Sequence, residues 1–226
     1  MCGRFVLQSA VEIISQIFRL GRVDVSLIPR YNIAPGQDIA IVVEEGGTRS
    51  LVSCRWGLVP SWAKDLSEGN KMINARAETV AEKPSFRQPF LRHRCLVVAD
   101  GFYEWRTEGG KKTPVYVRPR SGTPMGFAGL FNRWTGPDGA AVCTTTIITT
   151  EANDLVRPLH DRMPAITSPD RYDLWLSPGM QDQGRLQSVL TPCPSGLLEA
   201  YEVTSKVNAT KNDSPENIER MVDSRQ

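Results

Sequence analysis

Asp38-Ile-Ala-Ile-Val-Val-Glu-Glu-Gly-Gly-Thr-Arg-Ser-Leu-Val-Ser-Cys-Arg-Trp-Gly-Leu58 is the stretch of the chain that decides its fold class. Two runs rich in apolar and β-branched residues, Asp38–Glu45 and Thr48–Leu58, flank the pair Gly46-Gly47. Consecutive glycines accept the positive φ angles that a two-residue hairpin turn requires, and β-branched side chains favour extended backbone. The stretch therefore predicts an antiparallel β-hairpin.

The same kind of strand-forming run recurs through the rest of the chain. Gly109-Gly110 and the segment Gly136-Pro-Asp-Gly139 provide turns between several of these runs. The further predicted strands are Arg94–Trp105, Thr113–Arg118, Met125–Trp134, Ala141–Thr149, Met163–Thr167 and Leu197–Thr204.

Helical patterns are fewer and shorter. Ser9-Ala-Val-Glu12 resembles a capping box, and apolar residues follow at helical spacing until Gly21, which predicts one surface helix. Short helices are also predicted at Glu78–Ala81, after Thr150, and from Ser168 to Leu176, where the serine caps the helix and a proline follows. This pattern indicates an α+β fold, in which short helices flank a mainly antiparallel, curved or barrel-like sheet.

Length and composition indicate a single domain over residues 1–226, because 226 residues with 40% hydrophobic content can bury one substantial core. No apolar run approaches the ~18 residues of a membrane span, and no signal peptide is visible. We therefore expect a soluble, cytoplasmic protein. The polar tail from Lys206 should be extended on the surface and fray from about residue 217.

The five cysteines are odd in number, scattered and without CxxC spacing, which argues against both a disulfide framework and a zinc site. Cys54, Cys95 and Cys143 lie in apolar, strand-like runs and are expected in the core. Among the basic residues, 20 of 27 are arginine, which suits bidentate phosphate contacts. A GC-rich genome explains that ratio equally well, and the net charge is only +2.

The N-terminal pair Met1-Cys2 points to reactive chemistry. A small residue at position 2 allows methionine aminopeptidase to remove Met1, which leaves Cys2 with a free α-amine and a thiol. The α-amine has an ordinary pKa of ~7.7–8.0, so far more of it is unprotonated at neutral pH than of a lysine amine. Together the two groups convert an aldehyde into a five-membered thiazolidine through a Schiff base. Alternatively, Cys2 is an accident of the start site.

Two residues have the character of acid–base groups. Glu104 lies between Tyr103 and Trp105 at the end of an apolar run, where partial desolvation would raise its pKa. Its alternative is a solvent-facing position at a strand end. His160 lies in a loop between two prolines and suits proton transfer near neutral pH, although a structural loop histidine is an equal alternative. His93, in a basic run, is expected at the surface.

Other polar and aromatic residues suggest contacts to a ligand. Asn74 and Arg76 lie on the same side of an extended segment and form either a polar clamp or an ordinary loop. Trp56 and Trp62 bracket a short segment; exposed, they would stack on nucleic-acid bases, and buried, they would belong to the core.

Seven short motifs follow one another along the chain. They are Met1-Cys-Gly-Arg-Phe5, Arg30-Tyr-Asn-Ile-Ala-Pro35, Trp56-Gly-Leu-Val-Pro-Ser-Trp62, Ile73-Asn-Ala-Arg-Ala-Glu78, Gly101-Phe-Tyr-Glu-Trp105, His160-Asp-Arg-Met-Pro164 and Val207-Asn-x-x-x-Asn-Asp-Ser-Pro215. In this order they resemble the SRAP family, the SOS-response-associated-peptidase-like proteins that shield abasic sites. The resemblance spans residues 2 to about 217.

The resemblance implies a monomeric, β-rich SRAP domain that binds single-stranded DNA in a positively charged groove, without metal or cofactor. Cys2 would form a thiazolidine cross-link with the ring-opened aldehyde of an abasic site. Glu104 and His160 would be its acid–base groups, and Asn74 would hold the abasic sugar. Ala209 departs from the asparagine of many members, which puts one tail contact in doubt. The DNA-contacting residues that the resemblance implies are Arg4, Asn32, Pro35, Trp62, Arg76, Thr149 and Arg162.

Two other functions compete with this one. Cys2 and His160 would form the thiolate–imidazole pair of a cysteine peptidase, which would at least remove its own Met1. The chain shows no evident peptide-binding or oxyanion motif, which argues against general proteolysis. A noncovalent reader of single-stranded DNA would use the tryptophans and arginines but would leave the N-terminal aminothiol unexplained.

Overall fold

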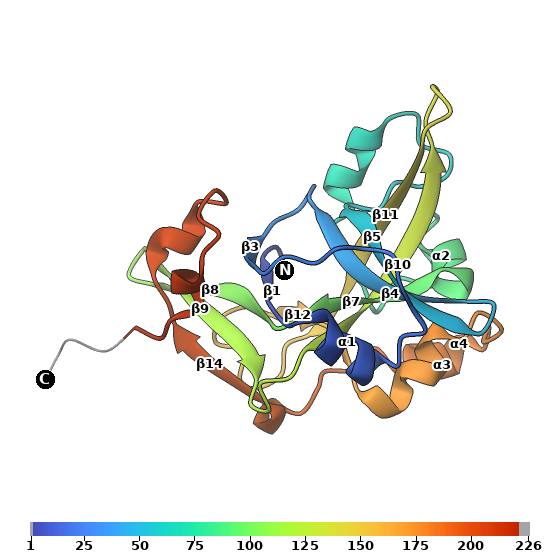
Figure 1. Ribbon diagram of the computed structural model, residues 1–226. Helices are drawn as coiled ribbons and strands as arrows, with labels where there is room; N and C mark the ends of the chain where they lie inside the picture. The colour runs from blue at the N-terminus through green and yellow to red at the C-terminus, as the bar shows by residue number, and fades with distance from the viewer. Residues whose placement is uncertain (1, 222–226) are drawn as a thin grey trace, which may run out of the picture.

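The computed structural model describes residues 2–221, and it has an α+β fold (Figure 1). The strands are β1 (Phe5–Leu7), β2 (Arg22–Val23), β3 (Arg30–Ile33), β4 (Asp38–Glu45), β5 (Thr48–Trp56), β6 (Asn74–Arg76), β7 (Arg94–Ala99), β8 (Gly101–Glu108), β9 (Lys111–Pro119), β10 (Met125–Thr135), β11 (Ala141–Glu151), β12 (Arg162–Pro164), β13 (Ile166–Thr167) and β14 (Leu198–Glu202). The α-helices are α1 (Val11–Phe18), α2 (Arg87–Arg92), α3 (Tyr172–Leu176) and α4 (Gln183–Gln187). The 3-10 segments are η1 (Leu66–Lys71), η2 (Pro169–Arg171), η3 (Ser195–Leu197), η4 (Ser205–Asn208) and η5 (Pro215–Ile218).

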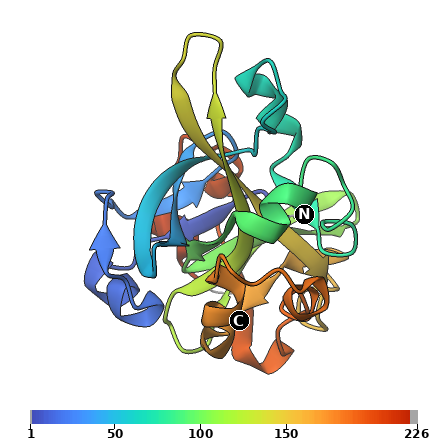
Figure 2. The same cartoon turned by 90° about the vertical axis from the view of Figure 1, so that its right-hand side faces the viewer.

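Five of the strands close into a barrel. β4 pairs with β5 and β7, β7 pairs with β10, and β10 pairs with β11, all antiparallel. β11 closes the ring through a short parallel pairing with β5, at Thr144↔Arg55 and Thr145↔Trp56. Beyond this point the β10–β11 hairpin stands out from the body of the molecule (Figure 2). The predicted curved, barrel-like and mainly antiparallel sheet is confirmed.

A second, antiparallel sheet has the order β14-β9-β8-β1-β3. Its strand β1 lies in the middle of the molecule (Figure 1) and buries both of its faces. Phe5 contacts Trp56 and Phe127 in the main core, with ring centroids 5.3 and 6.2 Å apart. Val6 points the other way, into a small core that contains Tyr103. Because successive strand residues face opposite sides, β1 joins the two cores and carries the N-terminal segment into the interior.

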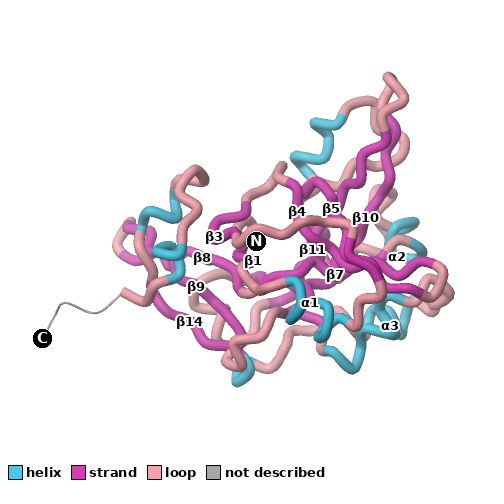
Figure 3. The backbone as a smooth tube through the Cα atoms, in the orientation of Figure 1, coloured by secondary structure: helices cyan, strands magenta, loops and turns pink. Residues whose placement is uncertain are grey.

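The helices lie on the outside of the strands (Figure 3). Helix α1 buries Ile14 and Phe18, and the ring of Phe18 stacks on Tyr172 of α3 with centroids 5.1 Å apart. None of the helices within residues 2–221 is long and apolar enough to cross a membrane.

The predicted hairpin is confirmed as β4 and β5, with Gly46 and Gly47 at φ angles of 59° and 76° in the turn. The helix predicted from Ser168 to Leu176 is present as η2 followed by α3, but the Ser168 side chain makes no capping hydrogen bond. The helices predicted at Glu78–Ala81 and after Thr150 are wrong, because both segments form turns. Such short segments lack enough hydrogen bonds to nucleate a helix without tertiary support. By contrast, α2 and α4 were not predicted.

The predicted strand Arg94–Trp105 is two strands, β7 in the barrel and β8 in the second sheet. The chain changes sheet at Asp100-Gly101, and at Gly101 a Cβ atom would come within 2.5 Å of the Tyr116 ring. Asp100 accepts hydrogen bonds from the backbone N–H groups of Gln8 and Ser9, and from the Ser9 hydroxyl at 2.5 Å. The predicted capping box is therefore wrong, since Ser9 binds Asp100 instead of capping α1.

The predicted strand Met163–Thr167 is also divided. β12 pairs with β11, whereas β13 pairs with β10, and Ala165 lies between them. Its backbone N–H donates to Ile148 O and its carbonyl accepts from Ala128 N, each at 2.8–2.9 Å. Ala165 therefore bridges β10 and β11 at the point where this segment stops pairing with β11 and begins to pair with β10.

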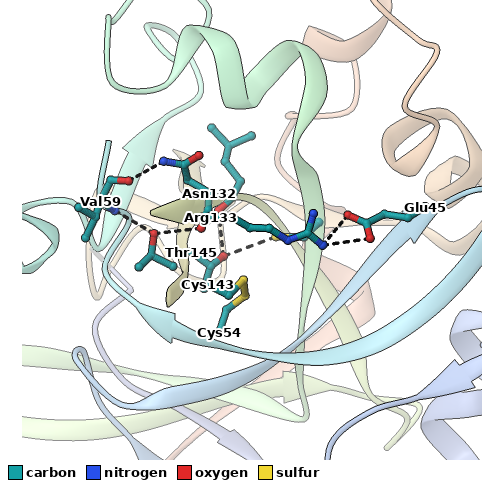
Figure 4. Close-up of a disulfide and its surroundings, with 10 residues drawn as sticks. Glu45, Cys54, Val59, Asn132, Arg133, Cys143 and Thr145 are labelled. Carbon is teal, nitrogen blue, oxygen red and sulfur yellow. Dashed lines mark hydrogen bonds and ion pairs between the residues drawn. A yellow bond between two sulfur atoms is a disulfide. The ribbon is translucent and has the colours of Figure 1, made fainter. Parts of the chain in front are cut away.

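The expectation that the cysteines form no disulfide is wrong for one pair. Cys54 on β5 is bonded to Cys143 on β11, with Cα atoms 4.7 Å apart (Figure 4). The two residues are 89 positions apart in the sequence, and they meet only because β5 and β11 close the barrel. Cys54 and Cys95 are buried as expected, whereas Cys143 is half-buried. His93 is exposed, as expected.

Candidate active site around the N-terminal cysteine

Cys2 lies in the short segment before β1 and is fully buried. Its carbonyl oxygen accepts a hydrogen bond from Asn74 Nδ2 at 2.9 Å. Asn74 begins β6, which pairs in parallel with β11 at Asn74↔Ile147. Asn74 Oδ1 is also buried, and within residues 2–221 it has no hydrogen-bond partner. The pairing of β6 with the barrel strand β11 thus fixes the side-chain amide of Asn74. Its nitrogen binds Cys2, and its oxygen remains an acceptor without a partner among residues 2–221.

The thiol of Cys2 is held in its neutral form. Burial raises the pKa of the Cys2 thiol far above its ordinary value, and the negative charge of Glu104 adds to the shift. A thiolate would be the form required of a peptidase nucleophile. The same shift shows that Glu104 lies close enough to Cys2 for their charges to interact.

Glu104 lies on β8, opposite Val115 of β9, and is only 4% exposed. Burial raises the pKa of its carboxyl to about 7. A group that titrates near pH 7 is present in both its proton-donating and proton-accepting forms, which suits general acid–base catalysis. The prediction of a partly desolvated glutamate is confirmed, and the alternative of a solvent-facing strand end is excluded.

His160 lies in the turn region between β11 and β12, where its backbone N–H donates to Val156 O at 3.0 Å. Its ring Nδ1 accepts from the backbone N–H of Arg162 at 2.9 Å, and the Asp161 carboxylate lies 2.7 Å from the same atom. Burial lowers the pKa of His160, which favours the neutral ring. In that form Nδ1 is an acceptor and Nε2 carries the proton; protonation of Nδ1 would make Asp161 its partner.

Glu104 and His160 line one cavity of about 490 Å³. The remaining lining residues are Trp105, Thr107, Lys112, Leu159 and Asn208. Lys112 and Asn208 had no predicted role, because only the β8–β9 hairpin and the C-terminal segment bring them to the two acid–base residues. The cavity places a carboxyl with a raised pKa and an imidazole with a lowered pKa at one location.

Arg76, Thr149 and Arg162 gather around β11. β6 pairs with one edge of the strand, at Thr149↔Arg76, and β12 pairs with the other, at Glu151↔Arg162. The Arg76 side chain is exposed. The Arg162 guanidinium donates to the Thr149 carbonyl at 2.5 Å and to both carboxylate oxygens of Glu78, at 2.7 and 2.9 Å. Thr149 itself is fully buried, and its hydroxyl donates to Ala75 O.

Arg4 and Asn32 are engaged with the C-terminal segment. The Arg4 guanidinium donates to Asn32 Oδ1 at 2.7 Å and to Val207 O at 2.8 Å. The amide nitrogen of fully buried Asn32 lies within hydrogen-bond distance of the carbonyls of Val207, Ala209 and Asn212. Both residues therefore fasten the tail to the domain, and Ala209 takes part through its backbone.

Pro35 and Trp62 are both exposed, and Trp62 exposes 62% of its surface. Trp56 is fully buried, so of the two tryptophans only Trp62 is available to stack on a base.

The polar tail from Lys206 is not the extended surface segment that the sequence predicts, because it contains η4 and η5 and Val207 is fully buried. Asn217 is fully buried and Tyr103 donates to its carbonyl, whereas residues 222–226 and the predicted removal of Met1 lie outside the described residues.

In the part of the chain that the structure describes, no group of three or more histidine, cysteine or acidic side chains is arranged to hold a metal ion.

The structure thus combines a five-stranded barrel, an attached antiparallel sheet and polar residues that surround Cys2. This combination defines the class of protein to which the chain belongs. The family profile described as SOS response associated peptidase (SRAP) matches residues 1–210. The chain belongs to the SRAP family, as the sequence motifs predicted.

Several relatives match over most of the chain. It is 45% identical to "Abasic site processing protein YoqW" of Bacillus subtilis over 222 residues, which cover 97% of this chain and 99% of the relative. It is 31% identical to "Abasic site processing protein HMCES" of Gallus gallus, covering 83% of this chain and 65% of the relative. A crystal structure of a protein from Bacteroides thetaiotaomicron matches with a TM-score of 0.87 and 28% identity, covering 98% and 100% of the two chains.

Proposed function

We propose that this protein processes abasic sites in single-stranded DNA by forming a covalent thiazolidine cross-link through Cys2 after removal of Met1. The observation that carries the proposal is the position of Cys2, whose carbonyl is held by Asn74 and whose thiol lies beside Glu104. Relatives that are named abasic site processing proteins support the same function.

The cross-link forms in three steps. The Cys2 α-amine adds to the aldehyde carbon of the ring-opened abasic sugar and gives a carbinolamine. Loss of one water, for which an acid protonates the leaving hydroxyl, yields the Schiff base. The thiol sulfur then adds to the imine carbon, and its proton passes to the nitrogen, which closes the five-membered ring. Because both groups belong to one residue, the last step is intramolecular and fast.

Glu104 and His160 divide the proton transfers. Glu104, next to Cys2 and with a pKa of about 7, takes a proton from the ammonium and returns it to the carbinolamine. His160, across the shared cavity, assists the opening of the closed sugar and the reversal of the adduct. Two groups with pKa values moved in opposite directions suit two different tasks.

The DNA strand runs along the arginines beside β11. Arg76 and Arg162 bind phosphates on either side of the abasic nucleotide, and Trp62 stacks on a flanking base. Asn74 Oδ1, which has no partner among residues 2–221, accepts a hydrogen bond from the sugar hydroxyl. We propose that the protein acts as a monomer, since the proposed groups all belong to one chain. Shielding the aldehyde then protects the site during the DNA damage response.

Peptidase activity is the competing function, and the neutral state of the Cys2 thiol argues against it. Intact-mass spectrometry after incubation with abasic single-stranded DNA tests the proposal. We expect a chain that begins at Cys2 and an adduct on that residue, with the loss of one water. Retention of Met1 in cross-linking protein would overturn the α-amine mechanism, and cleavage of added peptides without an adduct would favour the peptidase.

A further inference from the structure

The Arg162 guanidinium is already occupied by a carboxylate. Glu78 accepts two hydrogen bonds from the ends of the guanidinium fork, at 2.7 and 2.9 Å. This two-point geometry is the one by which arginine binds a phosphate. The side chain of Arg162 is only 13% exposed, whereas that of Glu78 is 47% exposed. A phosphate and Glu78 therefore compete for the same donors, and Glu78 is the partner that can swing away into solvent.

Glu78 interacts with the second cation as well. The hydrogen bond from Arg162 is the main reason why the pKa of Glu78 is lowered, and the charges of Arg162 and Arg76 contribute further. Arg76 lies opposite Thr149 on one edge of β11 and Arg162 lies opposite Glu151 on the other, so the two backbones are two strand spacings apart across the sheet and offset by two residues along it. One negative charge thus interacts with both cations and partly neutralises them.

From this geometry we infer that Glu78 is a resident anion that a DNA phosphate must displace from Arg162, and that it thereby limits the affinity and the salt dependence of DNA binding. The inference rests on the proposed function only in taking single-stranded DNA as the ligand. When a phosphate replaces Glu78, the freed carboxylate recruits a cation from solution, which offsets the cation released from the phosphate. The net release of ions at Arg162 is therefore small.

Glu78→Gln removes the charge and keeps the shape of the side chain. We expect it to bind a single-stranded oligonucleotide about fivefold tighter at low salt, because the phosphate no longer has to break one ion pair of a few ångströms in water. The slope of log K against log salt should steepen by up to ~0.7, one phosphate contact in a single strand. The matched control is Glu82→Gln, an exposed glutamate on the same segment, which makes the same change in net charge.

A double-mutant cycle shows whether the effect passes through Arg162. In an Arg162→Ala background the Glu78→Gln substitution should change affinity by less than twofold. Fluorescence anisotropy with an unmodified dT oligonucleotide measures all four proteins, and thermal unfolding checks that each is folded. If Glu78→Gln does not fold, Glu78→Ala takes its place.

Each outcome separates the inference from the proposed chemistry. Unchanged or weaker binding by Glu78→Gln, or an equal gain by Glu82→Gln or in the Arg162→Ala background, overturns the role of Glu78 while cross-linking by the wild type remains intact. If the wild type forms no adduct while Glu78→Gln binds DNA tighter than the wild type, the cross-linking is refuted and the inference is supported. Absence of DNA binding in every variant overturns both.

Discussion

The side-chain amide of Asn74 donates to the carbonyl oxygen of Cys2 across 2.9 Å and joins residues 72 positions apart in the chain. Asn74 is fixed by the pairing of β6 with β11, so the N-terminal segment takes its place from the barrel. A short, otherwise free N-terminus would sample many orientations. Anchoring its carbonyl removes that freedom before the reaction begins.

The two reactive groups of Cys2 can be separated by mutation. Cys2→Ser keeps the α-amine but replaces the thiol with a poorer nucleophile, so we expect a Schiff base that is trapped only when borohydride is added. Cys2→Ala should behave in the same way, and both should bind DNA as the wild type does. Denaturing gels with and without borohydride measure this. A heat-stable adduct formed by Cys2→Ser without reductant would contradict ring closure by sulfur.

Glu104 and His160 should differ in single-turnover kinetics. Loss of one acid–base group costs ~10²–10⁴ in rate, so Glu104→Ala and His160→Ala should both cross-link slowly. We expect Glu104→Ala to slow formation, and His160→Ala to slow formation and the reversal of preformed adduct. The wild-type rate should show a transition near pH 7, the pKa of Glu104, that is absent in Glu104→Ala. Wild-type rates for both variants in both directions would assign them structural roles.

Glu104 should also make folding stability depend on pH. Its pKa rises from 4.5 in ordinary surroundings to about 7 in the folded protein, so the folded state holds the proton more tightly than the unfolded chain. The free energy of unfolding should therefore fall as pH rises from 4.5 through 7, by ~3 kcal/mol at most. In Glu104→Gln, whose side chain stays neutral, the free energy of unfolding should depend less on pH. The control Glu82→Gln, at an exposed position, should keep the wild-type pH dependence. Urea denaturation at pH 5 and pH 8 gives the comparison.

Arg76 and Arg162 should contribute to DNA binding without regard to base sequence. Arg76→Ala should weaken binding and reduce the salt slope by ~0.7, the value of one phosphate contact in a single strand. Arg162→Ala should weaken binding too, with a loss of slope no larger than this, because Glu78 neutralises part of its charge. Salt titrations on two oligonucleotides of different sequence measure both effects. An unchanged slope for Arg76→Ala, or an unchanged affinity for Arg162→Ala, would remove that arginine from the phosphate-binding role.

Asn32 should act on stability more than on DNA affinity. Its amide is fully buried against the carbonyls of Val207, Ala209 and Asn212, and loss of a buried donor leaves acceptors unpaired at a cost of ~1–3 kcal/mol. Asn32→Ala should therefore lower the melting temperature and expose the C-terminal segment to proteolysis. A variant of wild-type stability with impaired DNA binding would instead make Asn32 a direct DNA contact.

Local patterns in the sequence were sufficient for much of this fold. The Gly46-Gly47 turn and its flanking β-branched runs predict β4 and β5, because turn type and strand preference depend on neighbouring residues alone. The aromatic neighbours of Glu104 predict its desolvation for the same reason. The order of seven motifs identified the family and, with it, the candidate quartet of Cys2, Asn74, Glu104 and His160.

Only the tertiary structure decided which distant segments meet. The division of residues 94–105 between two sheets, the Cys54–Cys143 disulfide and the grip of Glu78 on Arg162 all depend on strands that are paired across the barrel. No local pattern encodes these contacts, because β5, β6 and β12 reach the edges of β11 from three separate parts of the chain. The sequence thus determined the residues and their intrinsic chemistry, and the closed sheet determined their neighbours, their burial and therefore their pKa values.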